Sequence, residues 1–176
     1  DTLIRNGLVV DGSGQTPATR ADVGIVGDRI AAIGALDGAT AAQTIDATGR
    51  VVSPGFIDVH IHSEIALLGG GYRHGAVAQG VTTQLLAPDG FGWAQLPPER
   101  ARELYEYTLF AYGRHDLSFD WPTPEDYLAL FAGNTPANVL PQVPHCSVRL
   151  AVMGWEPRRA TDAEVAAMAT LTRAWY

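Results

Sequence analysis

The sequence contains no lysine and a single cysteine, and each of these scarcities limits the partners and the compartment that the protein can have. All 12 basic side chains are therefore arginine, against 19 Asp and Glu, and the formal net charge is −7. Nucleic acids and anionic membrane surfaces attract proteins through basic patches, whereas the arginines here are scattered. Cys146 alone cannot build an internal disulfide framework, and this favours a reducing compartment. We therefore expect no nucleic-acid partner, no membrane partner and a cytoplasmic location.

Long hydrophobic runs are also missing. No apolar stretch approaches the roughly 20 residues that cross a bilayer, and the first residues lack the profile of a signal peptide. Yet 47% of the residues are hydrophobic, which is too many for a disordered chain. A length of 176 residues would by itself suggest one domain with its own core.

Residues 1–52 have the pattern of short strands separated by turns. Gly27-Asp28 joins two alternating segments, and such a pair suits the positive φ of a two-residue hairpin turn. The expected strands are residues 3–10, 21–26, 29–33 and 44–46. This predicts a small antiparallel β module, which has too little bulk to form a large core without help.

From residue 53 onward, buried strand patterns alternate with helical ones, as in βα units with a parallel sheet. The expected strands are residues 56–62, 81–87 and 139–145, the last of them extended by 150–153. The expected helices are residues 72–79, a longer one that opens at Pro97-Pro98-Glu99, a short one from Pro124, and a last one that begins at a capping box of Thr161 and Glu164.

The most informative segment is residues 54–62, Pro-Gly-Phe-Ile-Asp-Val-His-Ile-His. On a strand, His60 and His62 point to the same side, so both imidazoles can bind one divalent metal ion. The alternative is a pair of histidines on a half-solvated strand without metal. The Pro-Gly entry, Asp58 and the βα pattern that follows favour the metal.

Residues 54–62 resemble the motif on the first barrel strand of the metal-dependent amidohydrolase superfamily. The β module, at residues 4–7 and 27–34, is similar to the beginning of that superfamily's accessory β-sandwich. Within the superfamily the chain most resembles the D-aminoacylases (N-acyl-D-amino-acid deacylases). The stretches that carry this likeness are residues 80–83, 120–121, 127–128 and 145–154. The resemblance covers essentially the whole chain but only the first part of such an enzyme.

The resemblance implies an α/β fold in which a partial small β-sandwich module (1–52) precedes the first part of a (β/α)₈ TIM barrel (53–176). A complete barrel needs about 250 residues, so this one is expected to be incomplete. The implied reaction is metal-dependent hydrolysis of a linear amide, an N-acyl-D-amino acid, with metal-activated water as the nucleophile. The implied metal is divalent, with zinc as the first expectation.

In such enzymes the general base and two further His ligands come from later strands. We therefore assign no catalytic residue in this chain, and expect a small-molecule substrate together with a C-terminal fragment or second chain that completes the barrel. Two alternatives stay open. The chain is the N-terminal half of a split or cleaved hydrolase that is inactive alone, or it belongs to a cyclic amidohydrolase that acts on hydantoin- or dihydropyrimidine-like rings.

The predicted metal ligands are His60, His62 and Asp89. Many D-aminoacylases have a metal-binding cysteine at the position of Asp89. A carboxylate is a harder ligand than a thiolate, so the site would still hold zinc but would accept manganese or iron more readily. The alternative is that Asp89 only forms a turn with Gly90.

The predicted substrate-binding residues are His145 and Arg149. His145 ends the expected third strand, where its imidazole could hydrogen-bond the amide oxygen or the substrate carboxylate, and Arg149 could pair with that carboxylate. A core histidine and a solvated arginine are the alternatives. Asp58 either orients an imidazole or is a structural acceptor. Glu64 lies past the expected strand end, so its direction is open.

Overall fold

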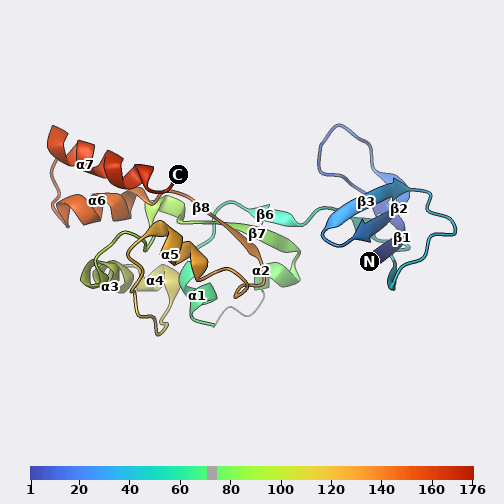
Figure 1. Ribbon diagram of the computed structural model, residues 1–176, viewed down its shortest axis with the longest axis horizontal. Helices are drawn as coiled ribbons and strands as arrows, with labels where there is room; N and C mark the ends of the chain where they lie inside the picture. The colour runs from blue at the N-terminus through green and yellow to red at the C-terminus, as the bar shows by residue number, and fades with distance from the viewer. Residues whose placement is uncertain (71–74) are drawn as a thin grey trace. The chain divides into compact units, whose positions relative to one another are not determined.

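The computed structural model describes residues 1–70 and 75–176. The chain forms two compact units, Asp1–Pro54 and Gly55–Tyr176, and each is described by itself (Figure 1). None of the helices in the described residues is long and apolar enough to span a membrane.

The first unit is one five-stranded sheet of mixed direction. Its strands are β1 (Thr2–Val9), β2 (Thr19–Val26), β3 (Arg29–Gly34), β4 (Gln43–Asp46) and β5 (Val51–Val52). β1, β2 and β3 are antiparallel, and Gly27 has the positive φ of 59° that the hairpin turn was predicted to need. β4 and β5, however, pair with β1 in parallel, so the expectation of an antiparallel module is wrong. The reason is the connection: loop 35–42 carries the chain back before β4 begins, whereas a tight hairpin would have reversed it.

The core of this first unit is small. Leu3, Val23 and Ala47 are its buried apolar residues, and Ile30 and Ile33 on β3 remain more than half exposed. Arg5 on β1 is paired with Asp22 on the neighbouring strand β2, since its guanidinium is 3.1 Å from an Asp22 carboxylate oxygen. This agrees with the expectation that the module has little bulk of its own.

The second unit contains a three-stranded parallel sheet in chain order, with β6 (Phe56–Asp58), β7 (Val81–Leu86) and β8 (Asn138–Pro141) side by side. Its helices are α1 (Glu64–Leu68), α2 (Gly75–Ala78), α3 (Pro98–Tyr107), α4 (Leu109–Tyr112), α5 (Pro124–Ala129), α6 (His145–Met153) and α7 (Asp162–Arg173), with a 3₁₀ turn at Pro88–Gly90. Of the helix expected over residues 72–79, the structure has α2, and residues 72–74 lie outside the described part of the chain.

β6 is shorter than predicted and ends at Asp58, so His60 and His62 follow the strand instead of lying on it. The cause is local. An oxygen of the Asp58 carboxylate accepts a hydrogen bond from the His60 N–H at 3.1 Å, and this turn replaces further pairing with β7. The contact also shows Asp58 as a backbone acceptor.

The predicted third strand is also corrected. β8 ends at Pro141, and residues 145–153, which include its expected extension, form helix α6. Pro141 and Pro144 have no N–H to give to a sheet, and Pro144 precedes the first helical residue, where a proline suits a helix start. His145 and Cys146 therefore do not lie on opposite faces of a strand. They occupy the first turn of α6.

The core of the second unit is built on aromatic rings behind the sheet. Trp93 is fully buried, and its ring meets those of Tyr105, Tyr112 and Phe119 edge-on at centroid distances of 5.0–6.1 Å. Trp121 donates its indole N–H to the carbonyl oxygen of Trp93 at 2.9 Å. These contacts fix helices α3 and α4 against the segment that follows β7.

Helix α7 begins with the predicted capping box, in which the Thr161 hydroxyl accepts from the Glu164 N–H and the Glu164 carboxylate accepts from the Thr161 N–H. We expect Thr161→Ala to lower the free energy of unfolding by about 1 kcal/mol. Thr170→Ala in the exposed middle of the same helix is the matched control. It should be neutral or stabilising, because alanine is the better helix former. Urea denaturation of both variants checks this, and equal effects would contradict the role of the cap.

Candidate metal centre

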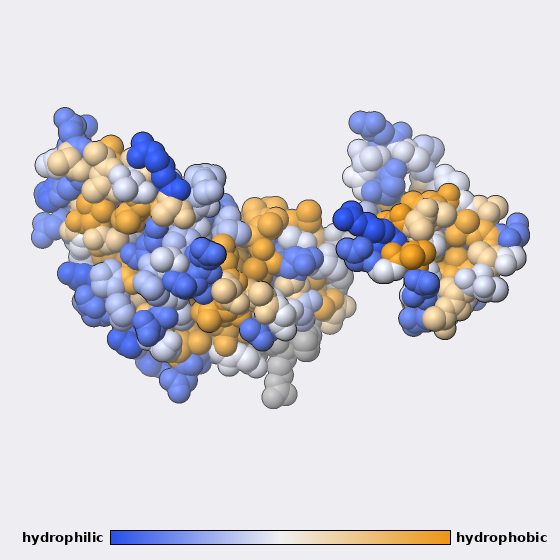
Figure 2. Space-filling view, in the orientation of Figure 1, coloured by the Kyte–Doolittle hydropathy of each residue, from blue (hydrophilic) through white to orange (hydrophobic). Residues whose placement is uncertain are grey.

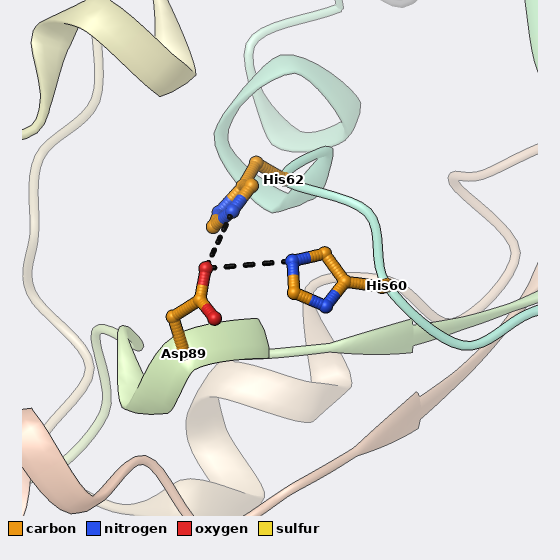
Figure 3. Close-up of side chains that lie close together, drawn as sticks. All are labelled: His60, His62 and Asp89. Atoms are coloured by element: carbon orange, nitrogen blue, oxygen red, sulfur yellow. Dashed lines mark ion pairs between the residues drawn. The ribbon is translucent and has the colours of Figure 1, made fainter.

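The parallel pairing of β6 with β7 brings two short segments to the same edge of the sheet. Phe56 pairs with Val81 and Asp58 with Gln84, so the carboxyl ends of both strands lie together. Residues 59–62 leave β6 at this edge, and the Pro88–Gly90 turn leaves β7. Figure 3 shows that the side chains of His60, His62 and Asp89 point toward one another from these two segments.

The three predicted ligands form one cluster. The Asp89 Oδ2 atom is 3.4 Å from Nε2 of His60 and 3.3 Å from Nε2 of His62, and the possible ligand atoms all lie within 4.8 Å of one another. Tetrahedral zinc with bonds of about 2.0–2.1 Å has ligand atoms roughly 3.3–3.4 Å apart, and both distances from Asp89 to the histidines match this spacing. In the described part of the chain, no other group of three or more His, Cys, Asp or Glu side chains is placed to hold a metal.

Asp89 lies in the turn that was the alternative interpretation, and its carboxylate also belongs to the cluster, so its role as a metal ligand stays a prediction. It lies in a turn, with the left-handed φ of 57°, and Ala87 before it also has a positive φ of 61°. That backbone directs the Asp89 carboxylate toward the two imidazoles. The side chains of His60 and Asp89 are 61% and 52% exposed, so the cluster is open to solvent on one side.

The His62 ring is held from behind by Tyr112. The Nδ1 atom of His62 lies 3.0 Å from the Tyr112 hydroxyl oxygen, and the two rings meet edge-on at 5.2 Å. This leaves Nε2 facing Asp89. Burial, with the negative charges of Glu64 and Asp89 adding to it, raises the pKa of Tyr112, so the phenol stays neutral. Such an outer partner fixes the orientation of a ligating imidazole.

Glu64, two positions after His62 in the chain, is fully buried. Its Oε1 atom accepts a hydrogen bond from the Ala87 N–H, and its Oε2 atom has no hydrogen-bond partner among the residues that the structure describes. Burial raises the pKa of Glu64 to about 7. The neighbouring Ser63 hydroxyl donates to the Gln84 side-chain oxygen at 2.6 Å. The segment that carries the histidines is thus tied to β7 and its turn by two buried side chains.

Comparison with known proteins assigns the chain that carries this cluster to a protein family. Residues 43–174 match the family model described as the amidohydrolase family. The chain belongs to the amidohydrolase family. D-aminoacylase of Alcaligenes xylosoxydans xylosoxydans is 40% identical over 176 residues, which are 97% of this chain and 34% of that protein. The chain therefore spans about a third of the length of this relative.

Solved structures of related enzymes have a fold similar to that of this amidohydrolase chain. A crystal structure of D-aminoacylase matches 99% of it with a TM-score of 0.83 and 36% identity, and the match covers 36% of that structure. N-acyl-D-glutamate deacylase from Bordetella bronchiseptica, in complex with zinc and a phosphonate inhibitor, matches 99% with a TM-score of 0.78 and 32% identity, over 35% of its own chain. A further D-aminoacylase structure addresses a binuclear metal centre.

The two predicted substrate-binding residues lie on α6 of the amidohydrolase chain, outside the cluster of three ligands. His145 is exposed at the first position of the helix, which adjoins the Asp89 turn, since the Cys146 thiol donates to the Asp89 carbonyl oxygen at 3.4 Å. Arg149 is engaged elsewhere. Its Nη2 atom donates to the carbonyl oxygens of Glu156 at 3.1 Å and Arg158 at 2.6 Å. These contacts tie α6 to the loop that follows it.

Two residues that support the ligand-bearing segments, Tyr112 and Glu64, could hardly be identified from the sequence. Tyr112 lies 50 positions from His62 and carries no motif, so only the packing of α4 shows the contact. Glu64 follows the same alternation as the two histidines, which was a signal, but the alternation could not reveal its burial or its bond to Ala87.

Tyr112→Phe tests the support of His62. The ring and its packing on Trp93 remain, so we expect a stability loss of only about 1 kcal/mol, the size of one hydrogen bond. Zinc affinity should fall about 10- to 100-fold, because the imidazole loses the partner that orients it. Tyr127→Phe, on another buried tyrosine of the same unit, is the control and should leave zinc affinity unchanged. Competition with a chromophoric chelator measures the zinc affinity of both variants. An unaltered affinity in Tyr112→Phe would exclude the role.

Proposed function

We propose that this chain is the first part of a zinc-dependent amidohydrolase that cleaves a linear amide, an N-acyl-D-amino acid, to a carboxylate and a free D-amino acid. The convergence of His60, His62 and Asp89 at the end of two parallel strands carries the proposal. The similarity to D-aminoacylase and to the zinc-bound N-acyl-D-glutamate deacylase supports the substrate class.

In this proposal residues 53–176 are the opening βα units of a TIM barrel, and residues 1–52 are a partial β-sandwich module. Three parallel strands in chain order, with helices between them, suit the beginning of such a barrel. Within the described residues, β6 and β8 each pair only with β7, and Phe56, Ile57 and Leu140 on them are 51–60% exposed. Figure 2 shows hydrophobic residues gathered on the surface where β6 lies in Figure 1. Further strands, from a C-terminal fragment or a second chain, would cover them.

The residues of this chain would each have a defined part. When bound, a divalent metal polarises the amide carbonyl and lowers the pKa of a coordinated water toward about 7. His60 and His62 would hold it through Nε2, and Asp89 would add a negative charge. Tyr112 would keep the His62 ring in place. The exposed imidazole of His145, beside the Asp89 turn, would hydrogen-bond the substrate.

Neither the base nor the remaining ligands are assigned to this chain, so in the proposal it is inactive alone. The two imidazoles suit zinc, and the harder Asp89 carboxylate makes manganese and iron more acceptable than a thiolate would. The acidic composition and the single cysteine support a reducing, cytoplasmic setting, which stays a prediction.

The metal site is tested by the zinc content of the purified chain after dialysis. We expect the parent to retain zinc and the double variant His60→Ala/His62→Ala to lose it, because two nitrogen ligands are removed. Cys146→Ser is the matched control, since the thiol is near Asp89 but outside the ligand cluster. It should keep the zinc. Unchanged zinc in the double histidine variant would contradict the site.

The substrate class is tested by hydrolysis once the polypeptide that carries the remaining strands is supplied. We expect release of the amino acid from N-acetyl-D-amino acids, little release from the L enantiomers, and no turnover by the chain alone. Ninhydrin detection of the free amino acid measures this. Preferential opening of hydantoin or dihydropyrimidine rings would instead support the cyclic amidohydrolase alternative.

A further inference from the structure

We propose that the buried carboxylate of Glu64 is a positioning residue that holds the Ala87–Gly90 turn and thereby sets the Asp89 carboxylate opposite His60 and His62. The inference deepens the proposed function and rests on the metal site assigned there. The residue touches none of the three proposed ligands directly through a hydrogen bond. It acts through the backbone of the turn that carries one of them.

The turn after β7 needs such a restraint. Ala87 and Asp89 both have positive φ, of 61° and 57°, a conformation that side chains other than glycine seldom adopt. It persists where surrounding contacts over-determine it. The Ala87 N–H is an inward-facing group of this turn, and its partner is the Oε1 atom of Glu64. Without that acceptor, the turn would lose a contact that opposes its relaxation.

The position of Glu64 explains why a carboxylate is buried here. It is the first residue of α1, two positions after His62, and is completely shielded from solvent. Its bond to Ala87 spans from the segment carrying both histidines to the segment carrying Asp89. A buried ionisable group is costly and is retained where its hydrogen bonds serve a specific arrangement. Here that arrangement is the fixed spacing between the two ligand-bearing segments.

Other contacts hold the far side of the same turn, which separates their effect from that of Glu64. The Ser147 hydroxyl on α6 accepts from the Gly92 N–H at 3.2 Å and donates to the Gly92 carbonyl oxygen, and the Cys146 thiol donates to the Asp89 carbonyl oxygen. These contacts anchor residues 89–92 to α6. Only Glu64, among the described hydrogen bonds, joins this turn to the histidine segment.

A double-mutant cycle in zinc affinity tests the proposal. We expect Glu64→Ala to weaken zinc binding by the chain about 10- to 100-fold, the range for partners that orient ligands. Glu64→Gln keeps an acceptor at Oε1 and should stay within about 3-fold of the parent by the same reasoning. In an Asp89→Ala background the effect of Glu64→Ala should disappear, because the residue acts through Asp89. Thr108→Val, which removes a buried hydroxyl elsewhere, should leave affinity unchanged.

A second measurement needs no metal. Amide hydrogen exchange in the metal-free chain should show Ala87 and its turn deprotected by Glu64→Ala but protected in Glu64→Gln, with β7 unaffected in both. Protection that survives Glu64→Ala would overturn the proposal, as would a loss of zinc affinity of equal size with and without Asp89. Absence of zinc binding by the parent would instead refute the proposed function, and exchange would still decide the role of Glu64.

Discussion

The parallel pairing of β6 with β7 is the constraint on which the rest of the second unit depends. It is possible because Gly55 has no side chain, since a Cβ atom there would overlap the side chain of Thr82 on β7. The Phe56 N–H then reaches the Gly80 carbonyl oxygen at 2.8 Å and sets the start of the strand pair. Both carboxyl ends therefore meet at one edge, where two ligand-bearing segments face each other.

That edge is built from an exposed layer supported by a buried one. The His60 and Asp89 side chains are more than half exposed, whereas Glu64, Gln84 and Tyr112 behind them are at most 3% exposed. Hydrogen bonds from this buried layer fix the ring of His62 and the backbone before Asp89. Ligands arranged in advance lose little freedom when a metal ion binds, and this is what a rigid outer shell contributes to a metal site.

The ligands could be predicted from sequence because their pattern is local, whereas their supports could not. His60 and His62 are two residues apart, and Asp89 follows the next strand. Yet the strand predicted to carry the histidines ends at Asp58, since its carboxylate captures the His60 N–H. The predicted third strand ends early, at Pro141, and its expected extension is part of a helix that begins at His145 after Pro144. The pairing of Tyr112 with His62 depends on how α4 packs, and no periodicity encodes a contact across 50 residues.

The metal ligands and strand β6 are both exposed to solvent, and the lack of a second neighbour for β6 among the described residues explains the exposure of both. The His60 imidazole and the Asp89 carboxylate are more than half exposed, so water competes with them for a cation, and a drier environment would strengthen their attraction to it. Phe56 and Ile57 are adjacent residues on β6, and both are 60% exposed, so this strand is poorly covered. Strands added along β6 would bury these side chains and shield the ligands beside them in one step. Covering the open strand and shielding the metal ligands are then the same event, because the ligand-bearing edge and the open apolar strand adjoin.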